Sequence, residues 1–170
     1  MSANSIRLDA AKQNKLFYFV ANVMVYRESD GRCLLLQRDP REAVHPGMWG
    51  CPGGKLEWED LDLEHPTRRN GDVLDYEDAV EKLCKREAFE EAGVEIEGPF
   101  HFINSNVFVR PDGIPVVLVK FAAKYKSGDI KLEVGGFVDS AWVNKEEVKN
   151  YPSIMGIEEE VAATIDAFSK

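Results

Sequence analysis

Three glutamates lie close together near the end of a predicted helix, in the segment Arg86-Glu87-Ala88-Phe89-Glu90-Glu91-Ala92-Gly93-Val94. At about 100° per residue, Glu87, Glu90 and Glu91 fall on one surface of that helix, within an arc of roughly 100°. Carboxylates this close repel one another and raise each other's pKa unless a cation lies among them. The hard divalent ions Mg²⁺ and Mn²⁺ prefer oxygen ligands, so the spacing indicates a metal site.

The ordinary alternative for such a run is an acidic helix face in contact with solvent. The preceding residues argue against it, because an apolar stripe leads into the glutamates and predicts, at the spacing i, i+3, i+4, i+7, apolar residues at 87 and 91. The sequence has Glu at both positions, so the carboxylates interrupt a surface that should face the core. The stripe consists of Tyr76, Val80, Leu83 and Cys84.

The helix that carries the glutamates is predicted to run from Tyr76 to Ala92, with Asp75 as its N-cap and Gly93 just after its end. Residues 39–55 and 57–74 are predicted to be long loops. Strands and helices interleave along the chain, which predicts the α/β class with a mixed β-sheet. The strands are expected at 17–26, 32–38, 100–110, 114–126 and 139–143, and further helices at 145–150 and 156–168.

A glycine-rich turn, Trp49-Gly50-Cys51-Pro52-Gly53-Gly54-Lys55, precedes the helix. Together with the segment from Arg86 to Val94, this turn resembles the Nudix hydrolase family, whose box reads G-x5-E-x7-R-E-U-x-E-E-x-G-U, where U is aliphatic. Gly54 matches the opening glycine, and the closing half matches in spacing, with Ala88 standing in for an aliphatic residue. The resemblance covers roughly residues 17 to 150 and implies an α/β/α sandwich.

The sequence departs from the family pattern in the middle of the box. Between Gly54 and Arg86 lie 31 residues, where the pattern has 13, so an insertion of 18 residues at about 57–74 is the simplest account. Counting back from Arg86 places the mid-box acid at Asp78, with Glu77 beside it. Asp72 and Glu57 are the other candidates for this position.

The resemblance implies hydrolysis of a diphosphate bond, assisted by Mg²⁺ or Mn²⁺. A bound metal ion activates water near neutral pH and neutralises charge on phosphoryl oxygens. Glu87, Glu90 and Glu91 are the expected metal ligands, with the Gly53 carbonyl as a further one, and Glu90 or Glu91 also as a candidate base. Arg86 is expected to pair with Glu90 at i, i+4 and to orient the site.

Many members of the family use a further acid, from a loop after the sheet, as base or ligand. Glu133 and Asp139 are the candidates here. Glu133 precedes Gly135-Gly136, which suggests a flexible approach to the site, whereas Asp139 precedes Trp142 and is expected to have a structural role. Glu133 is therefore included among the expected catalytic residues, together with Arg86, Glu90 and Glu91.

Length and composition fit one domain spanning residues 1–170, with 44% apolar residues and a net charge of −9. This charge argues against nonspecific binding to nucleic acid or to anionic membranes, but not against a phosphate substrate bridged by metal ions. The three cysteines lack metal-ligand spacing, and Cys33 and Cys84 are expected to be buried thiols. No signal peptide or long apolar run is seen, so the expected location is the cytoplasm. A homodimer is left open.

The expected function is metal-dependent hydrolysis of a nucleoside diphosphate linked to another moiety. Two alternatives stay open. One is a nucleoside triphosphate pyrophosphohydrolase that removes damaged nucleotides. The other is a ligand-sensing domain with weak catalysis, which the displaced mid-box acid would allow.

Overall fold

The computed structural model describes residues 6–169, so residues 1–5 and 170 of the predicted domain lie outside the described part. Its strands are β1 (Tyr18–Arg27), β2 (Arg32–Arg38), β3 (Trp49–Gly50), β4 (Gly53–Lys55), β5 (Arg68–Asn70), β6 (Val73–Asp75), β7 (Glu95–Val109), β8 (Pro115–Ser127) and β9 (Phe137–Val143). Its α-helices are α1 (Ala79–Ala92) and α2 (Ile157–Phe168), and its 3₁₀ helices are η1 (Gln13–Lys15), η2 (Trp58–Asp60) and η3 (Glu147–Asn150).

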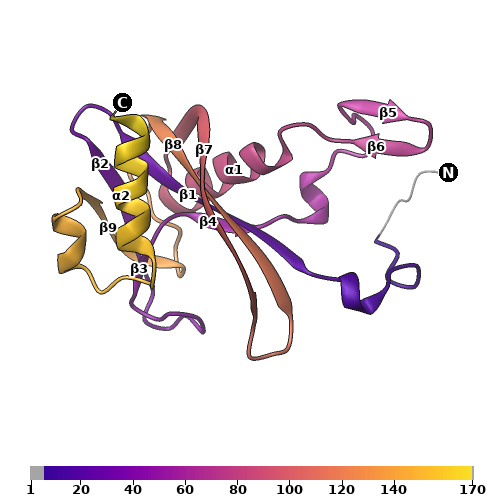
Figure 1. Cartoon of the computed structure of the whole chain (residues 1–170), viewed down its shortest axis with the longest axis horizontal. Coiled ribbons are helices and arrows are strands. Elements are labelled where there is room, and N and C mark those ends of the chain that lie inside the picture. Colours follow the sequence, from indigo (N-terminus) through magenta and orange to yellow (C-terminus); the bar gives the residue numbers. More distant parts are fainter. Residues whose placement is uncertain (1–5, 170) are drawn as a thin grey trace.

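The main sheet has the order β3-β2-β1-β8-β7, with β4 also pairing with β1 and β9 with β2. Strands β1 and β8 run parallel, whereas the other pairs are antiparallel. The sheet is therefore mixed, as the sequence predicts. Figure 1 shows it at the centre of the molecule, with the long β7–β8 hairpin extending beyond the helices.

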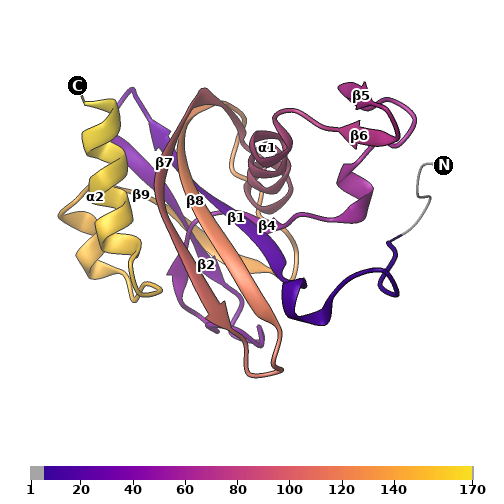
Figure 2. The same ribbon diagram turned by 45° about the vertical axis from the view of Figure 1, so that its right-hand side comes forward.

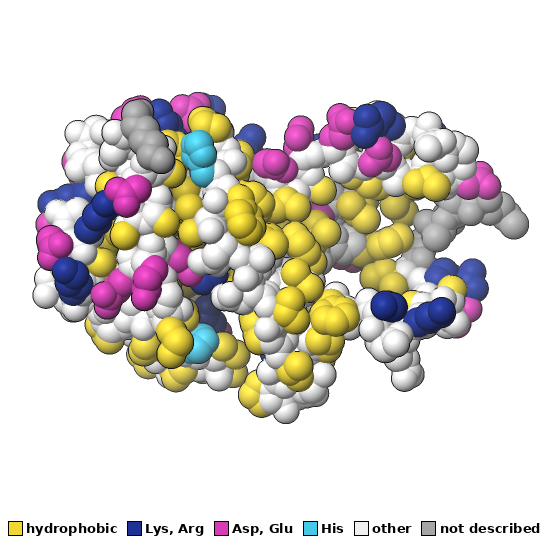
Figure 3. All heavy atoms as spheres, in the orientation of Figure 1, with side chains coloured by type: hydrophobic (Ala, Val, Ile, Leu, Met, Phe, Trp, Pro, Cys, Tyr) yellow, Lys and Arg dark blue, Asp and Glu magenta, His cyan; other side chains and the backbone are white. Residues whose placement is uncertain are grey.

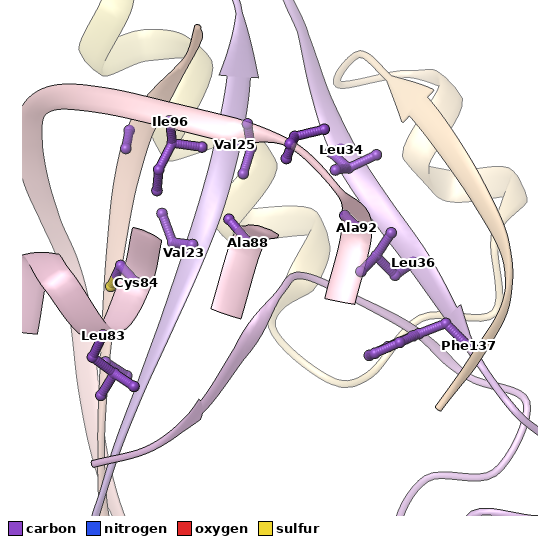
Figure 4. Close-up of a cluster of buried hydrophobic side chains, with 13 residues drawn as sticks. Val23, Val25, Leu34, Leu36, Leu83, Cys84, Ala88, Ala92, Ile96 and Phe137 are labelled. Carbon is purple, nitrogen blue, oxygen red and sulfur yellow. The ribbon is translucent and has the colours of Figure 1, made fainter. Parts of the chain in front are cut away.

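Strand β1 is apolar on both faces because helices cover both sides of the sheet. Ala21, Val23 and Val25 face the cluster under α1, which Figure 4 shows, whereas Met24 and Tyr26 join the cluster under α2. Alternate residues of a strand point to opposite faces, so a strand buried twice needs no polar side. Figure 2 shows α1 and α2 on opposite sides of the sheet, which confirms the α/β/α sandwich.

Helix α1 begins later than the sequence predicts. It starts at Ala79, and its N-cap is Asp78, whose φ of 57° lies in the left-handed region. The predicted cap, Asp75, is wrong because that residue pairs with Arg68 in the β5–β6 hairpin. The predicted end is confirmed: Gly93 has a φ of 72°, and its N–H donates to the Phe89 carbonyl over 2.8 Å.

The two predicted loops contain short strands that depend on tertiary pairing. Residues 39–55 include β3 and β4, and residues 57–74 include η2, β5 and most of β6. The β5–β6 hairpin projects from the body of the molecule (Figure 1). Two- and three-residue strands have no periodic pattern, so the sequence alone could not reveal them.

The other predicted elements are confirmed with shifted ends. Strand β7 begins at Glu95 rather than at 100, and β9 begins at Phe137 rather than at 139. The predicted helix at 145–150 is the 3₁₀ helix η3. Cys33 and Cys84 are buried free thiols, as expected. Within residues 6–169, no helix has the length and apolar character needed to cross a membrane.

Candidate active site

The last turns of α1 meet the glycines of β4, which pairs with β1 beneath the helix. The Gly53 N–H donates to Glu91 Oε2 over 2.9 Å. A Cβ atom at Gly54 would lie 2.2 Å from Glu87 Oε1. Any larger residue at position 54 would therefore displace the Glu87 carboxylate, which explains why this close approach of strand and helix needs glycine.

Glu87 and Glu91 are held in surroundings that disfavour their charge. Glu87 is 8% exposed, and burial raises the pKa of its carboxyl. Burial also raises the pKa of Glu91 to about 8, with further increases from the charges of Glu87 and Glu133. The hydrogen bond from Gly53 acts in the opposite direction. The site therefore has an excess of negative charge that a cation would relieve.

Arg86 supplies part of the positive charge at this site. Its Nη1 lies 2.9 Å from Glu87 Oε1 and 2.9 Å from Glu90 Oε2, which confirms the predicted i, i+4 pair. Its Nη2 donates to the Lys55 carbonyl over 3.1 Å. Arg86 also pairs with Asp60 of η2. Its Nη2 donates to Asp60 Oδ2 over 3.2 Å. Its Nε lies 2.9 Å from Asp60 Oδ1, but this contact is not aligned as a hydrogen bond. Arg86 thus joins β4, η2 and α1.

The loop between β8 and β9 brings Glu133 to the same end of α1. The Glu133 N–H donates to the Glu91 carbonyl over 3.1 Å, and the Lys131 N–H donates to the Ala92 carbonyl over 2.9 Å. These bonds use carbonyls that the end of a helix leaves free. The charge of Glu133 raises the pKa of both Glu87 and Glu91. Asp139 instead lies in β9 opposite Gln37.

The model of the NUDIX domain matches residues 18–163 of this chain. The chain belongs to the NUDIX domain family. It is a Nudix hydrolase, and the two segments that resemble the Nudix box lie at β4 and at the end of α1. No curated protein matches the chain.

Solved structures share the fold at low sequence identity. A MutT Nudix hydrolase from Burkholderia pseudomallei is 22% identical, with a TM-score of 0.63 over 88% of this chain and 98% of that one. The Nudix domain of Shewanella oneidensis NrtR, solved in complex with ADP ribose, is 16% identical, with a TM-score of 0.63 over 94% and 95% of the two chains. An ADP-ribose pyrophosphatase from Streptococcus suis is 18% identical, with a TM-score of 0.56 over 91% and 94%.

Among the acids between Gly54 and Arg86, Asp60 of η2 is the one that pairs with Arg86, and it was not one of the four candidates from the sequence. It is the sixth residue after Gly54, where the Nudix box has its glutamate, and it pairs with Arg86. Counting forward from Gly54 finds it, whereas counting back from Arg86 crosses the inserted residues and reaches Asp78. The extra residues thus lie between Asp60 and Arg86. Glu77 pairs with Arg68 of β5.

Nudix hydrolases in general use divalent metal ions. Among residues 6–169, no three His, Cys, Asp or Glu side chains already surround a common ion position. Arg86 forms ion pairs with two of the expected ligands, Glu87 and Glu90. The donors nevertheless fit Mg²⁺ or Mn²⁺, since they are oxygens, and desolvation raises the pKa values of two of the carboxyls, those of Glu87 and Glu91. Glu87, Glu90, Glu91 and the Gly53 carbonyl are the groups that could hold the ion.

Proposed function

We propose that this Nudix hydrolase cleaves, with Mg²⁺ or Mn²⁺, the diphosphate bond of a nucleoside diphosphate linked to another moiety. The observation that carries the proposal is the meeting of Glu87 and Glu91 with Gly53-Gly54 at the end of α1, under the influence of the Glu133 charge. Neighbours of the same fold include a domain solved with ADP ribose and an ADP-ribose pyrophosphatase, which supports this substrate class.

Each residue of the site has a separate task in this reaction. A bound divalent ion would lower the pKa of water and neutralise charge on the phosphoryl oxygens. Glu87, Glu90 and Glu91 would hold the ion, and the Gly53 N–H fixes the orientation of the Glu91 carboxylate. Glu133 takes a proton from the attacking water. Arg86 positions Glu87 and Glu90 through its ion pairs.

The Asp60–Arg86 pair bears on the alternative of a sensing domain with weak catalysis. That alternative depends on a defective mid-box position, and an acid that pairs with Arg86 supports an intact box. The triphosphate pyrophosphohydrolase differs from the leading proposal only in substrate.

The decisive experiment is a substrate panel with purified full-length protein. ADP-ribose, nucleotide sugars, dinucleoside polyphosphates and nucleoside triphosphates are incubated with Mg²⁺, and with chelator as control, and the products are separated by chromatography. We expect turnover of one of the diphosphate-linked classes, giving a nucleoside monophosphate, and none in chelator. Turnover of triphosphates alone would favour the pyrophosphohydrolase, and binding without turnover of any compound would favour the sensing domain.

A further inference from the structure

Strand β7 leaves one edge of the main sheet unpaired. It is 15 residues long, and within the described chain it pairs only with β8. Several of its apolar side chains face solvent, with exposed fractions of 60% for Phe102, 67% for Val107 and 68% for Val109. A long, exposed and apolar edge strand offers a row of free N–H and C=O groups to another strand. Strand β7 can therefore pair with a strand of another chain unless its side chains prevent this.

The usual protection against edge pairing is missing from most of this strand. Natural edge strands carry Lys, Pro or inward-facing charges that discourage pairing. Residues 102–109 of β7 contain no charged residue, in a chain of which 30% is charged. Figure 3 shows apolar side chains gathered over the β7–β8 hairpin, with charged ones concentrated on other parts of that face. We call residues 102–109 the uncharged strip. Since each copy carries a net charge of −9, two copies repel each other least where these strips meet.

The strip is also complementary to itself. Residues 102–108 read Phe-Ile-Asn-Ser-Asn-Val-Phe, which is the same in both directions apart from the exchange of Ile for Val. When two such strands pair antiparallel around Ser105, Ser105 meets Ser105, Asn104 meets Asn106, Ile103 meets Val107 and Phe102 meets Phe108. Cross-strand pairs of matching type stabilise antiparallel sheets, and two-fold symmetry forms each pair twice.

The inner side of β7 limits how much of this pairing is regular. The register of β7 against β8 shifts between Phe102 and Asn104, whereas it is continuous from Asn104 to Val109. The Ser105 pair and the two Asn104–Asn106 pairs thus lie on a regular stretch, and the outer apolar pairs involve the residues of the bulge. Bulges bend a strand and increase its twist without ending the pairing.

From these observations we propose that two copies of this chain associate through β7, antiparallel and with the two-fold axis at Ser105. The dimer then has one sheet that continues across both copies. The proposal concerns a surface on the sheet edge, formed by residues that take no part in the carboxylate site, so it stands or falls independently of the reaction.

The first test places charge on the axis. Ser105→Glu and Ser105→Lys each put two like charges opposite one another, which destabilises an antiparallel pair. By sedimentation velocity over a range of concentrations, we expect the unchanged protein to be dimeric and each variant to dissociate at a concentration at least about tenfold higher. Mixing the two variants should restore a dimer, because Glu then faces Lys. Val73→Glu, which adds the same charge to an exposed position on β6, is the matched control and should remain dimeric.

The second test fixes the register. Ser105→Cys should form a disulfide between two copies under mild oxidation, because directly opposed Cα atoms in antiparallel strands lie about 4.5–5.5 Å apart. Val73→Cys is the control for random collision and should not cross-link to a comparable extent. A monomeric unchanged protein would overturn the proposal. So would a Ser105→Glu protein that dimerises as well as the unchanged one, or cross-linking that is equal at positions 73 and 105.

Discussion

Glu91 is the residue on which the proposed metal site depends most, because its carboxyl is held by the Gly53 N–H while burial raises its pKa to about 8. Glu91→Gln keeps the size of the side chain and an oxygen that can accept from Gly53, but it removes the charge. We expect turnover to fall by about 10²-fold or more, the range for losing a strong electrostatic contributor. Steady-state kinetics with Mg²⁺ measure this. Glu95→Gln, at the exposed start of β7, is the control, and similar rates for the two variants would contradict the assignment.

Glu133 and Asp139 give a matched pair for the proposed base. Glu133→Gln should lower kcat by about 10² to 10⁴-fold, because removing a general base affects mainly the transition state. KM and the affinity for Mg²⁺ should change little. Asp139→Asn should leave kcat unchanged, since Asp139 lies in β9 away from the bonds that hold Glu133 at α1. If kcat falls by less than about threefold in Glu133→Gln, the helix carboxylates carry out catalysis without it.

At the scale of elements, η2 acts on α1 through the Asp60–Arg86 pair. Asp60→Asn should leave Arg86 less firmly placed and so loosen Glu87 and Glu90. Partners that orient metal ligands typically contribute roughly 10–100-fold to metal affinity, so we expect the Mg²⁺ concentration for half-maximal rate to rise by about that factor. Asp60→Glu should recover part of the loss. Glu59→Gln, in the same turn, is the control. An equal rise in the required Mg²⁺ concentration in this variant would show that the effect comes from loss of negative charge and not from the Asp60–Arg86 pair.

The β5–β6 hairpin can be removed without touching Asp60. Arg68 and Asp75 are directly paired, so replacing residues 69–74 by Gly-Gly closes the same hairpin with a short turn. We expect a folded enzyme that needs Mg²⁺ as before. A cavity of about 220 Å³ against α1 includes Tyr76 and Glu77 in its walls. These two residues directly follow the shortened hairpin, so a shift in their position should change substrate preference. Relative kcat/KM values across the substrate panel measure this.

A second deletion separates the two roles of the inserted segment. Removing residues 59–71 also removes Asp60, so this variant should lose activity or stability where the shorter deletion does not. If the two deletion variants have the same activity and stability, the Asp60–Arg86 pair contributes to neither. Circular dichroism and thermal unfolding show whether each variant is folded.

The elements that the sequence predicts well are those with a pattern of their own. Strand β1 is apolar on both faces, and the glutamates of α1 stand at helical spacing, so local residues suffice to identify them. Asp60 was missed because its partner, Arg86, lies far along the chain beyond the inserted residues. The start of α1 was missed because pairing of Asp75 with Arg68 decides it, and such tertiary contacts override local cap preferences.

At the scale of the whole molecule, the carboxyls of Glu87 and Glu91 couple metal binding to the stability of the fold. The pKa of Glu91 is raised to about 8 from an ordinary 4.5, and that of Glu87 is raised as well. In the metal-free protein, a group whose pKa is raised by folding contributes stability that is full below its unfolded pKa and is lost as the pH rises through its folded pKa. The free energy of unfolding in chelator should therefore fall between about pH 5 and pH 8. Asp39, with a pKa of about 2, titrates below this window.

Urea unfolding in chelator at several pH values measures this loss, which we expect to be on the order of 1–3 kcal/mol. Glu91→Gln should make the free energy of unfolding depend less on pH, because its amide does not titrate. Mg²⁺ added at pH 8 should stabilise the unchanged protein, since an ion that binds only the folded state raises its stability. It should stabilise Glu91→Gln much less. If the free energy of unfolding depends on pH equally in both proteins, these carboxyls carry no excess charge in the folded protein. If Mg²⁺ also stabilises neither protein, they do not bind the ion.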